Sequence, residues 1–122
     1  MPDTPAGLAP APAELTAEDA KLVTLARSAR ARIGAVEGAA VRDGDGRTYT
    51  GVTVTQPSFT LGALQLAVAS AVAAGATVLE AAALVTEAST LDDSAAAAVR
   101  DMSVKAPVFL ANPAGQPFAV LG

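Results

Sequence analysis

Two short β-strand patterns flank the tetrapeptide Asp-Gly-Asp-Gly at residues 43–46, and this arrangement leaves few options for the local fold. Asp-Gly pairs supply the positive φ angles that tight hairpin turns require. The segment after the turn, residues 47–55, is almost entirely β-branched, which favours a strand. We therefore predict a hairpin formed by residues 36–42 and 47–55. A calcium loop would need more oxygen ligands and a distant bidentate glutamate, so the turn interpretation is preferred.

The rest of the chain alternates between helical and strand patterns. A helix is predicted from the N-cap Thr16 to Gly34. A second, at residues 61–74, is apolar on nearly every side, which predicts a helix at the centre of the molecule. A third helix is predicted to begin at the acidic residues 92–93 and to end near Met102. Strands are predicted at residues 79–86, 108–111 and 117–121. The order α-β-β-α-β-α-β-β predicts a mixed sheet with helices on both faces.

The composition indicates one compact domain whose core is built from unusually small side chains. Hydrophobic residues make up 52% of the 122 residues, with alanine the commonest of them, whereas aromatic residues make up only 3%. Such a core lets helices approach closely and favours burial between subunits as well. Residues 1–13 hold four prolines among alanine and glycine, so we expect a flexible lead-in there and a domain at residues 14–122.

Several classes of partner are disfavoured by charge and hydropathy. The net charge of −4 argues against nucleic acid, which needs clustered cations. Arg27, Arg30 and Arg32 lie on one predicted helix and are interpreted as a solvated face. Residues 61–85 are nearly uncharged, but their alanine content and internal glycine argue against a membrane span. The first residues lack the pattern of a secretory signal, so a cytoplasmic location is expected.

One continuous stretch resembles the cytidine deaminase superfamily. The family pattern reads V-G-A-A, a D-G turn, T-G-x-N-V-E-N-A-S-Y-G-L and then a helix beginning C-A-E. The same stretch of this chain reads Glu37-Gly38-Ala39-Ala40, then Asp45-Gly46, and then TGVTVTQPSFTL at residues 50–61. The resemblance is dense over residues 36–76 and thin outside them. It implies a three-layer α-β-α fold with a mixed sheet of about five strands.

The residues that carry the family's chemistry are missing from this chain. The family holds zinc with thiolates and in some branches an imidazole, and a glutamate shuttles the proton. This chain has no cysteine and no histidine. Leu64 stands at the first thiolate position and Leu66 at the glutamate position, while the P-C-x-x-C motif falls within residues 91–97, which lack sulfur. We expect no metal, no cofactor and no catalytic residue. Leu64, Leu66 and Val68 are expected to fill the former metal cavity, with a dry apolar pocket as the alternative.

The family's ribose-binding N-V-E triplet is altered but still polar. It reads Thr-Val-Thr here, and the resemblance makes Thr53, Thr55 and Gln56 candidate contacts for a nucleoside-like ligand. The hydroxyl groups lack the charge and reach of the carboxylate that they replace.

Other polar residues have simpler interpretations. Asp92 and Asp93 are explained by the first turn of a helix, where acidic side chains cap the chain and favour the dipole. Glu80 and Glu87 flank an apolar strand and are expected to be solvated. No serine has a histidine to activate it, which excludes the ordinary serine hydrolase mechanism.

Three functions therefore remain. The preferred one is a catalytically inactive deaminase-like domain, a homo-oligomeric dimer or tetramer that serves a structural role or contacts a protein partner. The alternative is a small-ligand module that binds a nucleoside-like molecule through Thr53, Thr55 and Gln56. An enzyme with metal-free carboxylate chemistry ranks last, because no general base is recognisable.

Overall fold

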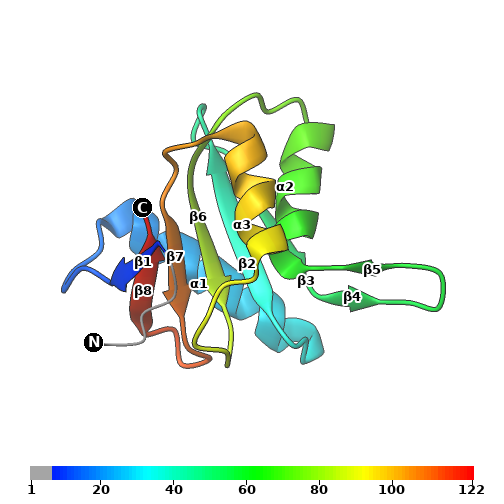
Figure 1. Cartoon of the computed structure of the whole chain (residues 1–122), viewed down its shortest axis with the longest axis horizontal. Coiled ribbons are helices and arrows are strands. Elements are labelled where there is room, and N and C mark those ends of the chain that lie inside the picture. Colours follow the sequence, from blue (N-terminus) through cyan, green and yellow to red (C-terminus); the bar gives the residue numbers. More distant parts are fainter. Residues whose placement is uncertain (1–6) are drawn as a thin grey trace.

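A computed structural model describes residues 7–122 of the chain. A mixed sheet lies between α1 on one face and the α2 and α3 helices on the other (Figure 1). The strand order is β1-β8-β7-β6-β2-β3, and β4 and β5 pair separately. The helices are α1 (Ala17–Ile33), α2 (Ala63–Ala73) and α3 (Asp93–Met102). The strands are β1 (Leu8–Pro10), β2 (Gly38–Asp43), β3 (Thr48–Val52), β4 (Val54–Thr55), β5 (Thr60–Leu61), β6 (Leu79–Val85), β7 (Val108–Ala111) and β8 (Pro117–Leu121). The predicted three-layer α-β-α fold is confirmed.

The sheet contains one parallel pair, β6 and β7, and its other neighbouring strands are antiparallel. Helix α3 lies between these two strands in the sequence, as a parallel connection requires a crossover. Strand β2 pairs with both β3 and β6, so Gly38 at its start lies beside Val52 and Val85 at their ends. The chain leaves β3 and β6 at one end of the sheet and goes on from there towards α2 and α3.

Helix α1 begins and ends where the sequence predicts. The Asp19 amide donates to Oγ1 of Thr16 at 3.1 Å, which satisfies one of the free donors of the first turn. At the other end, Gly34 adopts a left-handed conformation with φ of 62° and closes the helix. Its buried side chains are small or branched and face the sheet, namely Leu22, Val23, Ala26 and Ala29.

Two glycines of the family pattern allow the helices to touch the sheet. A Cβ atom on Gly38 would lie 2.3 Å from the carbonyl oxygen of Ala26 in α1. A Cβ atom on Gly51 would lie 2.5 Å from both the Ala63 oxygen and the Ala67 nitrogen in α2. Real side chains do not approach backbone so closely, so each glycine is a contact point at which one helical layer rests on the sheet.

The predicted turn between β2 and β3 is held by a buried aspartate. Asp43 Oδ1 accepts hydrogen bonds from the amides of Asp45 and Arg47, each at 2.9 Å, and Gly46 has a φ of 84°. The Tyr49 hydroxyl donates to Asp43 Oδ2 at 2.7 Å. This bond lowers the pKa of the Asp43 carboxyl, against the effect of burial, and it raises the pKa of Tyr49. The turn interpretation of the tetrapeptide is therefore confirmed.

The sheet has one strand more than expected, because part of the lead-in is ordered against it. Residues Leu8–Pro10 form β1 and pair antiparallel with β8, and the Leu8 side chain is buried in the core. Proline is compatible with this position because β1 is an edge strand, where one row of amides has no strand to bond. The remainder of the predicted flexible segment, residues 1–6, lies outside the described residues.

Helix α2 does not lie at the centre of the molecule, contrary to the prediction from its apolar sequence. One side packs on the sheet, but Ala69, Val72 and Ala73 on the other side are exposed, Val72 to 54%. The sheet has only two faces, and α2 forms an outer layer on one of them beside α3. None of the helices within residues 7–122 has the length and apolarity needed to cross a membrane.

The second strand of the predicted hairpin is shorter than expected. Strand β3 ends at Val52, and the chain then enters a separate two-stranded hairpin. We call residues 54–61 the arm. It projects from the body of the molecule (Figure 1).

Candidate functional site

The positions that carry the family's chemistry belong to the face of the sheet covered by α2 and α3. Leu64 in the first turn of α2 is 1% exposed and packs in the main core together with Val68. Leu66 is half-buried and borders a small hollow of about 160 Å³, which it lines with Ile33 and Val52 among others. Thus Leu64 and Val68 fill the core, as expected, while Leu66 lies at the edge of the packed region.

The start of α3 offers no metal ligand of the family type. Asp92 is the N-cap residue by position, but its side chain makes no capping hydrogen bond, so the predicted cap is present only as favourable charge near the helix N-terminus. Asp92 and Asp93 are both exposed, and four alanines follow at residues 95–98. Within residues 7–122, no three His, Cys, Asp or Glu side chains are grouped so that they could hold a metal ion. Zinc prefers nitrogen and sulfur donors in a tetrahedron, so the residues present do not fit it.

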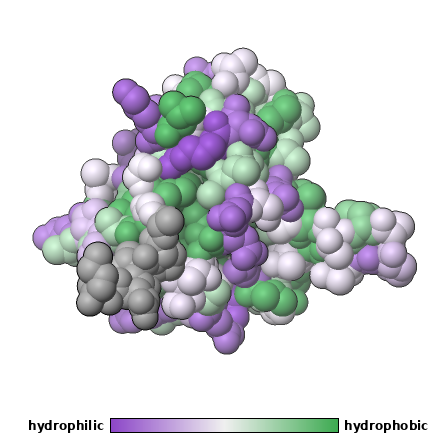
Figure 2. Space-filling view, in the orientation of Figure 1, coloured by the Kyte–Doolittle hydropathy of each residue, from purple (hydrophilic) through white to green (hydrophobic). Residues whose placement is uncertain are grey.

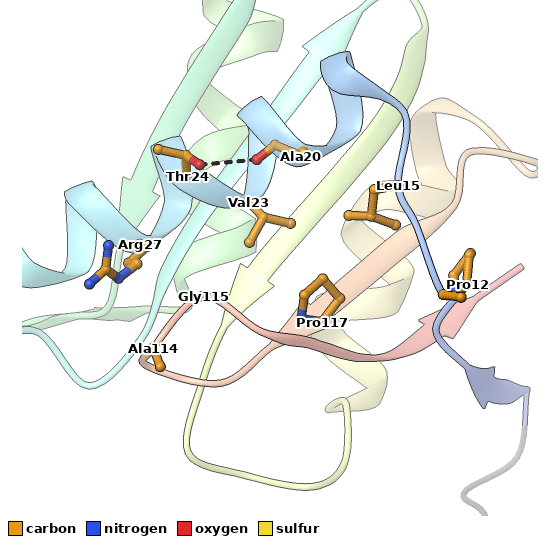
Figure 3. Close-up of a pocket in the computed structure, with 10 residues that line it drawn as sticks. Pro12, Leu15, Ala20, Val23, Thr24, Arg27, Ala114, Gly115 and Pro117 are labelled. Atoms are coloured by element: carbon orange, nitrogen blue, oxygen red, sulfur yellow. Dashed lines mark hydrogen bonds between the residues drawn. The ribbon is translucent and has the colours of Figure 1, made fainter.

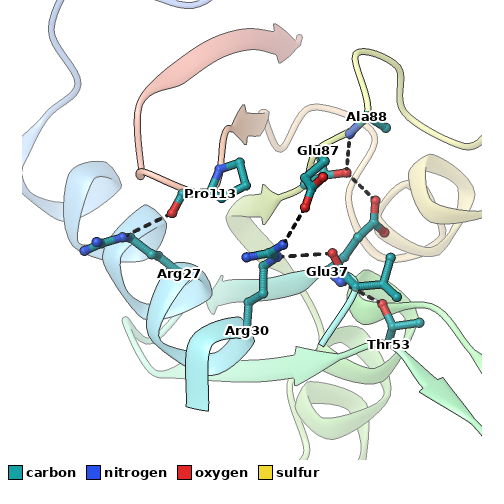
Figure 4. A network of polar contacts seen from close by, with 9 residues as sticks. Arg27, Arg30, Glu37, Thr53, Glu87, Ala88 and Pro113 are labelled. Carbon is teal, nitrogen blue, oxygen red and sulfur yellow. Dashed lines mark hydrogen bonds and ion pairs between the residues drawn. The ribbon is translucent and has the colours of Figure 1, made fainter. Parts of the chain in front are cut away.

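A carboxylate that the sequence analysis did not single out lies at this end of the sheet. Glu37 precedes β2, and its Oε2 accepts a hydrogen bond of 2.5 Å from the Thr86 hydroxyl, which follows β6 (Figure 4). Thr86 is 2% exposed, and its oxygen also accepts from the Ala88 amide at 3.0 Å. The bonds connect β2 to the loop that leads into α3. The available signal was a charged residue at a position where the family pattern has valine.

The arginines of α1 connect the helix to the loops at the same end of the sheet. Arg30 donates to the Val36 carbonyl at 3.2 Å and forms an ion pair with Glu87 at 3.1 Å (Figure 4). Arg27 donates to the carbonyl of Pro113, in the loop after β7, at 3.3 Å. Arg27 and Arg32 are exposed, as predicted, but the Arg30 side chain is only 21% exposed. Arg27 and Arg30 thus connect α1 to loops of the sheet.

Glu80, which lies in β6 rather than before it, and Glu87, which follows β6, have exposed side chains, as predicted, and both are in ion pairs. Glu87 is paired with Arg30, and Glu80 accepts from Arg42 at 2.9 Å. Arg42 also reaches Asp19 in α1 at 3.0 Å. These contacts join α1, β2 and β6, which indicates a structural role for both glutamates.

The three candidate ligand-binding residues do not converge on one pocket. Thr53 Oγ1 accepts a hydrogen bond from the Glu37 amide at 3.1 Å, so its oxygen is already used to join two backbone segments. Thr55 and Gln56 lie in the arm and are exposed. The main cavities of residues 7–122 are lined by other residues.

Comparison with known proteins identifies similar sequences and structures. A family model described as "Cytidine deaminase-like" matches residues 15–115. The crystal structure of cytidine deaminase from Burkholderia pseudomallei aligns with a TM-score of 0.72 at 23% identity, over 81% of this chain and 88% of that chain. Cytidine deaminase from Mycobacterium leprae aligns with a TM-score of 0.63 at 21% identity, over 85% and 94% of the two chains. That from Mycobacterium tuberculosis aligns with a TM-score of 0.63 at 24% identity, over 80% and 85%. No curated protein sequence matches the chain.

Proposed function

We propose that the chain, which belongs to the cytidine deaminase-like family, has no deaminase activity and serves as an oligomeric structural module. The observation that carries the proposal is the pair Leu64 and Leu66 at the positions of a zinc thiolate and the proton-transferring glutamate. Deamination by this family needs a metal to activate water and an acid-base group to move the proton. A leucine side chain does neither, and the chain has no cysteine or histidine to replace the missing ligands.

Helix α2 supports the oligomeric part of the proposal. Its sequence, ALQLAVASAVA, contains no charged residue, yet one side of it faces solvent in the single chain. A helix that is apolar all round is normally buried on all sides. Apolar side chains gather over α2 in the space-filling view (Figure 2). Within residues 7–122 only one side of α2 is covered, so another protein surface would cover the other side.

The arm also supports contact with a partner. Strands β4 and β5 pair through two residues each, and a two-stranded hairpin of this kind is at best marginally stable in water. Phe59, between these strands, is 55% exposed. Contact with a partner would both stabilise the hairpin and bury this aromatic ring.

A second copy of the chain is the partner that best suits the exposed side of α2 and the arm. The exposed side of α2 is formed by small residues, Ala69 and Ala73, around Val72, and such residues allow two identical helices to approach closely. The proposal therefore places the protein as a homo-oligomer in the cytoplasm, with neither nucleic acid nor membrane as its partner. The nucleoside-binding alternative has less support, since Thr55 and Gln56 lie on the arm rather than in a cavity.

Light scattering of the purified chain tests this proposal. We expect a dimer or tetramer at tens of micromolar, and we expect Val72→Glu to shift it to monomer, because a carboxylate buried without a partner is strongly unfavourable. Val104→Glu is the matched control, since Val104 is 74% exposed and lies outside α2, in the segment between α3 and β7. A monomeric wild-type protein, or an equal effect of the two substitutions, would overturn the oligomeric assignment.

A further inference from the structure

A cavity of about 330 Å³ lies on the α1 face of the sheet, opposite to the face that carries Leu64 and Leu66. It is formed by the segment before α1, by the part of α1 from Ala20 to Arg27, and by residues 114–117, from the turn after β7 to the start of β8 (Figure 3). Pro12 lies at one end and Arg27 at the other, with Leu15, Val23 and Pro117 between them (Figure 3). The volume is at the small end of the range for ligand pockets, about 300–1,000 Å³.

The lining side chains give this cavity one charged end and one apolar end. Arg27 is the only charged residue among those that line it, and Thr24 is the only other with a polar side chain. The Thr24 hydroxyl already donates to the Ala20 carbonyl at 3.1 Å. The site therefore offers a ligand one cationic side chain, and the other side chains that line it, apart from Thr24, are apolar.

Arg27 is held in place, but no side chain of the described residues neutralises its charge. Its Nε donates to the Pro113 carbonyl, and its side chain passes over Gly115, where a Cβ atom would lie only 3.0 Å from Arg27 Cδ. Within residues 7–122, no carboxylate forms an ion pair with Arg27, whereas Arg30 and Arg42 are both paired. The terminal nitrogens of a guanidinium form a planar fork that suits a carboxylate.

We propose that this cavity binds a small organic monocarboxylate with an apolar body. The guanidinium of Arg27 would pair with the carboxylate, and the apolar body would lie along Val23, Leu15 and Pro117 towards Pro12. One arginine balances one negative charge. This favours a monoanion over a phosphate group, which needs more donors.

The test uses hexanoate as the probe and two-dimensional amide NMR of the full chain as the measurement. Hexanoate should bind saturably at millimolar concentration and shift the amide signals of Ala20, Thr24 and Gly115. Hexanol and hexylammonium, which share the apolar chain, should bind more weakly. Absence of saturable binding, or shifts confined to another part of the molecule, would overturn the proposal.

Variants separate the charge from the cavity. Arg27→Gln should weaken hexanoate binding about tenfold, as expected for loss of a charge-assisted pair, and should leave hexanol unchanged. Arg32→Gln, on the same helix but outside the cavity lining, should have no effect. Ala20→Leu fills the cavity from an exposed position and should weaken both probes without disturbing Arg27. If Arg27→Gln and Arg32→Gln behave alike, or if hexanol binds as tightly as hexanoate, the carboxylate assignment is wrong.

Discussion

Asp43 shows how much of the local fold depends on one side chain. It is buried, and its two oxygens accept hydrogen bonds from two amides of its own turn and from the Tyr49 hydroxyl. The Asp-Gly pattern was enough to predict the turn, because glycine and aspartate have strong local preferences. The bond to Tyr49 could not be predicted, since it depends on the register of β3 against β2.

The pKa of Asp43 leads to a prediction at this scale. A lowered pKa in the folded state means that the ionised carboxyl stabilises the fold above the ordinary pKa of aspartate, and that this stability is lost as the pH falls through the lowered value. Tyr49→Phe removes the largest cause of the lowered pKa. We therefore expect the variant to have a lower urea midpoint than wild type at pH 7, and the difference to shrink below about pH 4. A difference that is the same at acid and neutral pH would contradict this account.

The elements themselves were largely predictable, and the exceptions have physical causes. Strands β7 and β8 have the predicted bounds, and α1 and α3 agree with the prediction to within about a residue, because periodicity, caps and turn residues are local signals. The position of α2 was predicted wrongly because an apolar sequence does not determine where in the molecule a helix lies. Strand β1 was missed because its short proline-rich sequence forms a strand only where β8 offers an edge.

The contact of α2 with the sheet gives a prediction at the scale of elements. Gly51→Ala should lower the free energy of unfolding by about 2–3 kcal/mol, because the new methyl group overlaps the backbone of α2. Gly62→Ala is the matched control, since its Cβ would meet only the flexible Gln65 side chain, at 3.3 Å. Urea denaturation measures both. Equal losses in the two variants would show that the close approach at Gly51 is not the cause.

At the scale of the whole molecule, the family pattern predicted the architecture better than it predicted the site. The glycines of V-G-A-A and T-G-x-N are required by the close packing of the helices on the sheet. Because this chain keeps both as Gly38 and Gly51, the resemblance predicted the fold correctly. The Glu37 and Thr86 pair joins residues 49 positions apart, and no local pattern contains it. The cavity beside Arg27 was missed for the same reason, because three separate segments form it.

The retained scaffold and the replaced chemical groups lead to the central claim that this chain does not deaminate cytidine. The assay that tests it most directly measures uridine formed from cytidine by the purified full chain, with zinc supplied in the buffer. We predict no more uridine than in the buffer alone. Uridine that forms in proportion to the amount of protein, and that disappears when a chelator is added, would contradict the claim.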